Sequence, residues 1–592
     1  MEENKLKQER DMNKTILLTK KAKTLLFALL LGAPLAASAQ GDILIDEANF
    51  PDEAFRSYLL SQSYGTDGVL TKAEIKEITR IDVYHKNISS LKGIEHLTAL
   101  EKLYCYNNQL TELDISKNTA LTDLSCSYNQ LTDLDLSNNA ALIEIACHGN
   151  PLSALDLSKN AALKTLYCSN TQLIALDLSK NMALTFLDCS NTQLTALDLS
   201  KNAALEDLNC GNTQLTALDL SKNTALTGLS CNDTQLTTLD LSKNMALKYL
   251  FCDNTQLTAL NVSGHTALVS IYCYDNPQLT TLNVSGCAAL TQLHCYNSQL
   301  TTLDVSGCAA IMWISCYGNQ LTTLDVSDCA ALLQLDCYNN QLTALNASGC
   351  GEVRSIYCGN NQLTALDVSG CTALEYLSCV ENQLSTLDLS DCPGLISLSC
   401  SDNQFTSLSL SDCPGLIFLD CSGNQLTTLD LSDCTRLGNV SCFNNQLTAL
   451  DLPEDCTTLY GVYCYHNQIK EAAMETLVNS LPQPALAMQY YYFIVYDKTE
   501  TGEGNVCTKT QIATVKAKGW TPGYIYYDNG ELAWAEYEGI DDDDPMGVAQ
   551  PTTEKAGRES APVYTLSGQK VTGDLNGRKG VHVVGGKKVL IK

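Results

Sequence analysis

Cysteine recurs along this chain at an almost constant spacing, and this regularity constrains the fold more than any other feature of the sequence. A first series steps by 21 residues from Cys105 to Cys273, takes one step of 22 residues to Cys295 after an insertion near Pro277, and then returns to 21 until Cys442. With Cys464 the series has 18 members. A fixed period of about 20–29 residues predicts a stack of similar coils, because one such unit is too small to bury its own apolar face.

The apolar residues within one period predict two short strands per coil. In one unit the inward positions are Leu163, Leu166, Cys168, Leu173, Leu176 and Leu178. Each half of the unit ends by alternating apolar and polar residues, which is typical of a strand with one buried face. The sequence therefore predicts a mainly β solenoid of about 19 coils of 21–22 residues, the first centred on Val83, with short strands on both sides. At a strand spacing of ~4.8 Å the rod would be on the order of 90 Å long.

The regular cysteines fall at inward-facing strand positions, so we interpret them as small buried apolar side chains. Neighbouring coils would hold parallel Cβ vectors ~4.8 Å apart, which is a poor geometry for a disulfide. We therefore expect reduced thiols and not bridged rungs. A metal ladder is disfavoured too, because it would need converging mixed ligands.

Further columns of residues are predicted to be structural because they repeat from coil to coil. A second cysteine series, from Cys287 to Cys456, occupies the turn after the second strand. Earlier coils fill this slot with Asn118, Asn139, Asn160, Asn181, Asn202, Asn223 and Asn244. A third column begins with Gln109, Gln130, Gln172 and Gln193. Stacked Asn and Gln amides are expected to hydrogen-bond to each other and to the turn backbone.

The units LYCYNNQLTELDISKNTAL and LSCSYNQLTDLDLSNNAAL resemble the internalin-type leucine-rich repeats of bacterial surface proteins, especially the subgroup with a cysteine ladder. The segment ITRIDVYHKNISSLKGIEHLTAL is similar to an ordinary internalin repeat. This resemblance covers residues 78–468. It implies a curved, right-handed solenoid with a parallel sheet on its concave side, and a role in adhesion or partner binding without chemistry. The ligands of that family are not carried over, because they depend on exposed residues that vary between members.

The flanking segments complete the domain organisation. We expect a signal peptide at 1–39, an N-terminal cap at 40–77 with a helix over 52–62, repeats at 78–468, a C-terminal cap at 469–540, a linker at 541–560 and a β tail at 561–592. Within the first cap, Asp67, Gly68 and Glu74 match the fifth, sixth and twelfth positions of a calcium-binding loop, but Ser63 and Gly65 match its first and third positions poorly. A plain cap that covers the end of the apolar core is the alternative.

The two ends of the chain indicate export. Basic residues, an apolar run over 24–35 and Ala37-Ser38-Ala39 form the pattern of a secretory signal cleaved before Gln40. The segments VHVV and KKVLIK flank Gly585-Gly586, which predicts a hairpin. This tail resembles the sorting domains of the type IX secretion route of gram-negative bacteria, and a small β-module without a targeting role is the alternative. We expect a secreted or outer-surface protein with no membrane-inserted segment in the mature chain.

Composition excludes several functions. The formal net charge of −29 disfavours nucleic acid as a partner and suits either solubility or attraction of cationic partners. No phosphate loop, zinc-protease helix motif or nucleophile elbow is present, and the seven histidines are scattered. We therefore expect neither an enzyme nor a cofactor.

The candidate binding site is an aromatic patch on the concave face. Residues on either side of the ladder cysteine point outward, and from the eighth coil these positions become aromatic. The patch consists of Tyr249, Phe251, Tyr272, Tyr274, Tyr296, Trp313, Tyr317, Tyr338 and Tyr357. Rigidly held aromatic side chains favour a binding site, whereas aromatic columns that only stabilise the sheet are the alternative. We expect a monomer that binds an extracellular protein, with a glycan ligand or a structural matrix role as the second hypothesis.

Overall fold

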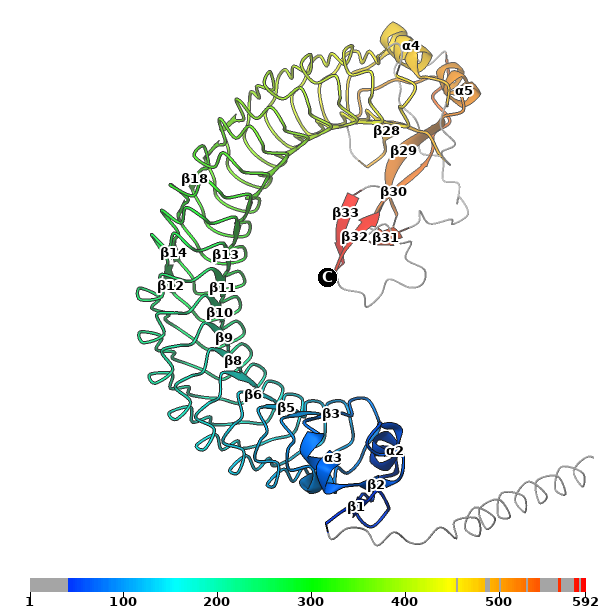
Figure 1. Cartoon of the computed structure of the whole chain (residues 1–592). Helices are drawn as coiled ribbons and strands as arrows, with labels where there is room; N and C mark the ends of the chain where they lie inside the picture. The colour runs from blue at the N-terminus through cyan, green and yellow to red at the C-terminus, as the bar shows by residue number, and fades with distance from the viewer. Residues whose placement is uncertain are drawn as a thin grey trace, which may run out of the picture. The chain divides into compact units, whose positions relative to one another are not determined.

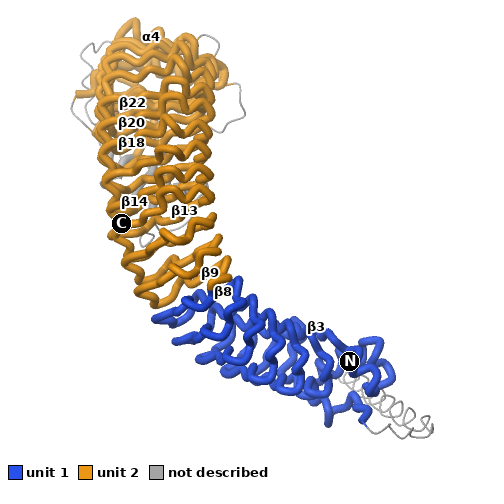
Figure 2. Tube along the Cα trace, turned by 60° about the vertical axis from the view of Figure 1, so that its left-hand side comes forward, with its two compact units in different colours: residues 1–202 blue, residues 203–592 orange. Residues whose placement is uncertain are grey.

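The computed structural model describes residues 41–453, 456–484, 490–499, 502–528 and 531–542, together with the backbone of three strands near the C-terminus. The predicted signal peptide and most of the predicted linker lie outside the described residues. The chain divides into two compact units, residues 1–202 and 203–592, which Figure 2 colours blue and orange. Each unit is a leucine-rich-repeat solenoid, as the sequence predicts.

Unit 1 begins with a small cap. Strands β1 (Ile43–Leu44) and β2 (Val69–Leu70) pair antiparallel, and the cap also contains helices α2 (Glu53–Ser61) and α3 (Lys72–Glu77). Asp52 caps α2 by accepting a hydrogen bond from the Phe55 amide, which confirms the predicted helix. The 3-10 helix η1 (Ile94–His96) lies within the first coil.

The coils of unit 1 form one parallel sheet. Its strands are β3 (Arg80–Asp82), β4 (Lys102–Tyr104), β5 (Asp123–Ser125), β6 (Glu144–Ala146), β7 (Thr165–Tyr167) and β8 (Phe186–Asp188). Each strand pairs in register with the strand one coil further on. The repeat spacing therefore fixes the register, because equivalent residues of successive coils become neighbours.

Unit 2 repeats the same design over thirteen coil strands. They are β9 (Asp207–Asn209), β10 (Gly228–Ser230), β11 (Tyr249–Phe251), β13 (Ser270–Tyr272), β15 (Gln292–His294), β17 (Trp313–Ser315), β19 (Gln334–Asp336), β21 (Ser355–Tyr357), β23 (Tyr376–Ser378), β24 (Ser397–Ser399), β25 (Phe418–Asp420), β26 (Asn439–Ser441) and β27 (Gly461–Tyr463). In Figure 1 these strands follow the inner side of this unit's arc.

The second side of the coils differs from the expectation of strands throughout. Among the described residues, regular second strands occur only in six consecutive coils: β12 (Ala259–Asn261), β14 (Thr281–Asn283), β16 (Leu303–Asp304), β18 (Thr323–Asp325), β20 (Ala344–Asn346) and β22 (Ala365–Asp367). Five of these coils place Val at the second inward position, where most other coils have Leu. The local ladder therefore coincides with the coils that carry Val, a β-branched residue that favours extended backbone.

The core confirms the predicted inward positions. Both cysteine series and the repeating leucines are almost completely shielded from solvent. All 28 thiols are buried and unbridged. The regular cysteine thus acts as a small apolar residue at the end of each first strand.

Burial also makes these thiols unreactive. It raises the pKa of Cys105 and Cys147 to about 12, against an ordinary value of 9.0. At pH 8 only about one such thiol in 10,000 would be ionised, and the thiolate is the reactive form. We therefore expect alkylation by iodoacetamide at pH 8 to be at least about a thousandfold slower than that of an exposed cysteine. Mass spectrometry of native and urea-unfolded protein checks this, and rapid alkylation of the folded chain would contradict the buried ladder.

A polar ladder runs beside the cysteines and was not foreseen from the sequence. The residue three positions after each ladder cysteine is Asn or Thr in most coils. The Asn319 amide donates to the carbonyls of Cys295 and Cys316 at 2.9 Å each, and its oxygen accepts from the Leu300 amide at 3.0 Å. In coils with Thr, such as Thr213, the hydroxyl donates to the carbonyl of the preceding cysteine at 2.8 Å. This ladder satisfies the backbone where the chain leaves the sheet.

The predicted Gln column does not form such a ladder. The side chains of Gln109 and Gln130 are exposed, and it is their backbone amides that donate to carbonyls of the preceding coil. The reason is that the residue directly before each Gln points inward and bonds the available backbone groups, as Asn108 does with the Val83 and Cys105 carbonyls. A Gln side chain of this column that does bond backbone is Gln299, which donates to the Pro277 carbonyl at 2.6 Å.

The Asn or Cys position in the turn after the second half of each coil bonds the turn backbone, as expected. The Asn118 amide donates to the carbonyls of Ile94 and Leu97 at 2.9 Å each. Where cysteine replaces Asn, the thiol donates to an equivalent carbonyl, as Cys287 does to Val262 at 3.2 Å. The prediction that the two residue types fill the same small space is confirmed.

The C-terminal cap continues the solenoid. Helix α4 (Glu471–Ser480) and helix α5 (Lys509–Ala517) lie within the predicted cap at 469–540. Strand β28 (Tyr492–Asp497) adds to β27, followed by β29 (Thr521–Asp528) and the antiparallel β30 (Glu531–Glu536).

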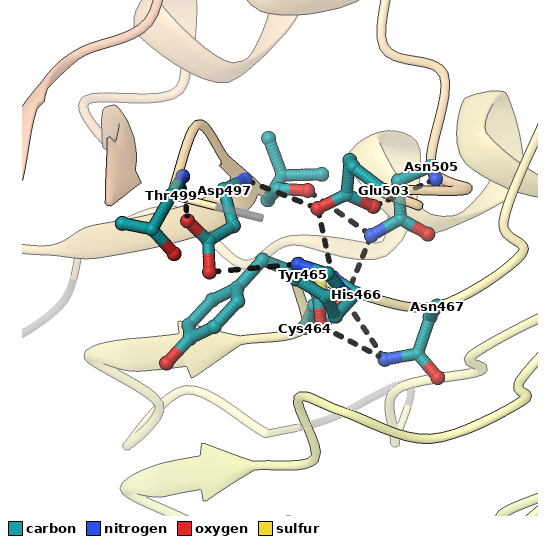
Figure 3. A network of polar contacts seen from close by, with 9 residues as sticks. Cys464, Tyr465, His466, Asn467, Asp497, Thr499, Glu503 and Asn505 are labelled. Atoms are coloured by element: carbon teal, nitrogen blue, oxygen red, sulfur yellow. Dashed lines mark hydrogen bonds and ion pairs between the residues drawn. The ribbon is translucent and has the colours of Figure 1, made fainter. Parts of the chain in front are cut away.

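The polar network in Figure 3 fixes this cap to the last coil. Glu503 accepts hydrogen bonds from the amides of His466 at 2.8 Å, Asp497 at 3.0 Å and Asn505 at 2.8 Å. Asn505 extends the polar ladder, because its amide donates to the Cys464 carbonyl at 2.8 Å. His466 lies 3.6 Å from the Asp497 carboxylate. We interpret this buried network as structural.

The predicted tail hairpin is also present in the backbone. Strands β31 (Val563–Thr565), β32 (Gly580–Val584) and β33 (Lys587–Ile591) form an antiparallel sheet, and β32 pairs with β33. Among the residues that the structure describes, no helix combines the length and apolar character needed to cross a bilayer.

Candidate functional site

The candidate site lies on what we call the first-strand face of unit 2: the outward side chains of strands β9 to β27 and of the residue after each ladder cysteine. Each three-residue strand has its middle residue buried and its two ends at least partly exposed in most coils. Because all strands pair in register, outward residues of successive coils form straight columns. The nine aromatic residues predicted from the sequence all lie on this face, between β11 and β21.

Four of these residues form a continuous tyrosine stack. Tyr274, Tyr296, Tyr317 and Tyr338 each follow a ladder cysteine in consecutive coils. Successive ring centroids are 4.5 Å apart and the interplanar angles are 6–8°. Ring faces within the stack therefore cover each other, and the ring edges and hydroxyl groups are what a partner can meet.

A second, shorter stack lies on the other side of the cysteines. Phe251 and Tyr272 have ring centroids 5.0 Å apart, and Tyr272 and His294 are 4.6 Å apart. The Tyr272 hydroxyl donates to Gln292 at 2.7 Å. The sequence prediction did not include His294 in the patch, although it occupies the same column as Phe251 and Tyr272.

Three predicted residues stand apart from both stacks. Among the described residues, Tyr249, Trp313 and Tyr357 make no ring–ring contact. Tyr249 is 47% exposed and Phe251 is 37% exposed, and these are the most accessible aromatic rings of the patch. The structure thus brings the predicted residues onto one face but divides them into two stacks and three separate rings.

Titratable groups on this face are shifted mainly by burial. Desolvation raises the pKa of Tyr296 and Tyr338 to about 12, so both hydroxyls stay protonated at neutral pH. Desolvation lowers the pKa of His294, which leaves this ring uncharged near pH 7. Burial raises the pKa of Asp253, and the nearby Asp233 and Asp275 carboxylates raise it further. The face is therefore aromatic and acidic.

The calcium candidates of the N-terminal cap have protein partners. Asp67 accepts a hydrogen bond from the Val69 amide at 3.1 Å. Glu74 accepts from both the amide and the hydroxyl of Thr71 at 2.8 Å, which forms a capping box for α3. Within the described ranges, no group of three or more His, Cys, Asp or Glu side chains is arranged to hold a metal ion. Calcium binding here stays a prediction.

The parallel, in-register coils and their Leu, Cys and Asn columns define a leucine-rich-repeat protein. Residues along this chain are similar to part of Internalin J of Listeria monocytogenes, with 37% identity over 71 residues. That stretch spans 12% of this chain and only 8% of the relative. No protein-family model matches the chain.

One solved structure supports the fold, and a second is similar over most of the chain. YopM from Yersinia enterocolitica superposes with a TM-score of 0.50 at 21% identity, covering 76% of this chain and 96% of YopM. The functional domain of InlJ from Listeria monocytogenes, described as including a cysteine ladder, aligns with a TM-score of 0.44 at 24% identity, covering 85% of this chain and 94% of that domain.

Proposed function

We propose that this protein is an exported surface protein that binds a protein partner through the first-strand face of unit 2. The observation that carries the proposal is the concentration of nine aromatic residues on one rigid, in-register face. Aromatic side chains held by a sheet lose little entropy on binding, which suits them to the centre of an interface. The proposed route of export uses residues 1–39 as a signal and the C-terminal tail as a sorting signal.

The stacking geometry favours a protein over a sugar as the ligand of the tyrosine stack. A sugar ring recognises an aromatic residue mainly through the ring face, but the inner faces of Tyr296 and Tyr317 are covered by their neighbours. What remains is a ridge of ring edges and neutral hydroxyl groups. Such a ridge fits the mixed apolar and polar surface of a protein.

A glycan ligand or a role in a surface matrix is the second candidate. It is favoured by Tyr249, Trp313 and Tyr357, whose ring faces have no ring neighbour among the described residues. These three rings would be the ones to stack on sugars.

The test is a binding screen of the purified full chain against immobilised extracellular-matrix proteins and glycans. A variant with Tyr274→Ala, Tyr296→Ala, Trp313→Ala and Tyr317→Ala is measured beside it. One aromatic hot spot contributes about 2 kcal/mol, or about thirtyfold in affinity, and the variant removes four aromatic residues. We therefore expect it to bind a protein partner at least about a hundredfold more weakly.

A matched control removes exposed apolar side chains elsewhere. Ile174→Ala with Met182→Ala changes residues that are 63% and 64% exposed and lie in unit 1. We expect this control to bind like the unaltered protein. A protein ligand whose affinity is unchanged in the aromatic variant would contradict the proposed site, and a ligand set of glycans alone would favour the second candidate.

A further inference from the structure

The first-strand face of unit 2 carries an excess of negative charge around its aromatic residues. Over coils β9 to β19, its strands and adjoining turns contain six carboxylates: Glu206, Asp207, Asp233, Asp253, Asp275 and Asp336. The same positions contain one permanent cation, Lys248. His294 does not offset this excess, because burial lowers its pKa.

These carboxylates have no cationic partner within the protein. None of the six forms an ion pair with a described residue. Their hydrogen bonds come from neutral groups: Asn297 donates to Asp275 at 2.9 Å, and Gln334 and Ser315 donate to Asp336 at 3.0 Å and 3.1 Å. Hydrogen bonds from neutral groups therefore hold these carboxylates in place, but no cation of the described residues neutralises their charge.

Three of the carboxylates meet the end of the tyrosine stack. Asp253 stands one coil before Tyr274 in the same column and is hydrogen-bonded by the Tyr274 hydroxyl. Asp233 and Asp275 belong to the neighbouring turns and raise the pKa of Asp253 through their charge, in addition to the effect of burial. A cation placed here would relieve this repulsion.

We propose that the partner docks a Lys- or Arg-rich segment on this face, with its cationic groups at Asp253 and Asp275 and its aliphatic side-chain stems along the tyrosine stack. This inference rests on the proposed function and specifies its partner. Long basic side chains suit the arrangement, because their stems cover apolar surface while the charged ends reach the carboxylates. The complementary charge also raises the rate of encounter with such a partner.

The experiment measures binding of two fluorescent peptides to the full chain. One peptide repeats the triplet Arg-Ser-Leu, and the other has Glu in place of Arg. The test variant is Asp253→Asn with Asp275→Asn. Asn keeps one acceptor oxygen at each position and tolerates the left-handed backbone of Asp275, whose φ is 51°. The control variant, Asp219→Asn with Asp240→Asn, makes the same change of net charge on the opposite side of the coils.

We expect the Arg peptide to bind and the Glu peptide not to bind. The test variant should weaken binding about tenfold, and the control variant should change it less than about twofold. Raising the salt concentration about tenfold should also weaken binding. Equal binding of both peptides, no binding of the Arg peptide, or equal losses in the two variants would overturn the proposal. A protein partner that depends on the tyrosines but not on Asp253, Asp275 or salt would overturn it while leaving the proposed function intact.

Discussion

Replacing Asn319 by Ala is expected to lower the free energy of unfolding of unit 2 by about 3 kcal/mol, because three buried backbone groups lose their partner. The side chain bonds the carbonyls of Cys295 and Cys316 and the amide of Leu300, and it is only 8% exposed. Urea unfolding followed by circular dichroism measures the change. Asn319→Asp should be at least as damaging, since a carboxylate cannot donate to either carbonyl.

Two comparisons distinguish the ladder from a general effect of mutation. Asn319→Thr should recover part of the loss, because the chain itself uses Thr213 and Thr234 at equivalent positions, where each hydroxyl donates to a cysteine carbonyl. Gln320→Ala, which alters the adjacent exposed side chain, should change stability by less than about 0.5 kcal/mol. Equal losses in the free energy of unfolding for Asn319→Ala and Gln320→Ala would show that the polar ladder contributes no stability.

Ile314→Ala is expected to lower the free energy of unfolding by about 3 kcal/mol through the cavity that it leaves. Ile314 is completely buried in β17, between Leu293 of β15 and Leu335 of β19. It lies on the strand that carries Trp313, so the lost packing lies directly beneath the aromatic patch. Each coil of a solenoid contacts only its neighbours, and we therefore expect faster hydrogen exchange confined to the adjacent coils.

Ile174→Ala provides the matched control, because the same residue type is 63% exposed there. Its expected effect is within about 0.5 kcal/mol. If the two isoleucine substitutions cost the same, or if exchange rises evenly through unit 2, the in-register pairing of β15, β17 and β19 would be contradicted.

The repeat period made most of the fold predictable. Cysteine and leucine spacing fixed the coil length, and the alternation next to each cysteine fixed which side chains face inward. The end of the helix at 471–480 was predictable because Pro482 follows it directly.

The second strands were overpredicted for a physical reason. Alternation in Leu-Asp-Leu-Ser indicates extended backbone with one buried face, but it does not determine whether adjacent coils come close enough to hydrogen-bond. That closer pairing appears chiefly where Val replaces Leu, as at Val262 and Val326. The residue at this one position therefore distinguishes most of the coils with second strands, whereas the pattern shared by all coils does not.

The candidate site was predictable in location but not in its internal geometry. Outward positions directly beside the cysteines identified seven of the nine aromatic residues, and Tyr249 and Trp313 lie three residues before a ladder cysteine on the same strands. The separation into two stacks depends on coil register and ring orientation, which place Tyr274 on Tyr296 while leaving Trp313 alone. The polar ladder could have been found from the recurrence of Asn or Thr three residues after most ladder cysteines, because an Asn at the end of a strand commonly bonds turn backbone.

The most direct test of binding through the first-strand face is site-specific photo-cross-linking to a bound protein partner. The photoreactive amino acid p-benzoylphenylalanine is placed either at Tyr296, within the tyrosine stack, or at Asp219, on the opposite side of the coils in the same unit. We predict a covalent adduct with the partner from position 296 and none from position 219. An adduct from position 219 alone would place the interface on the other side of the solenoid and contradict the proposed function.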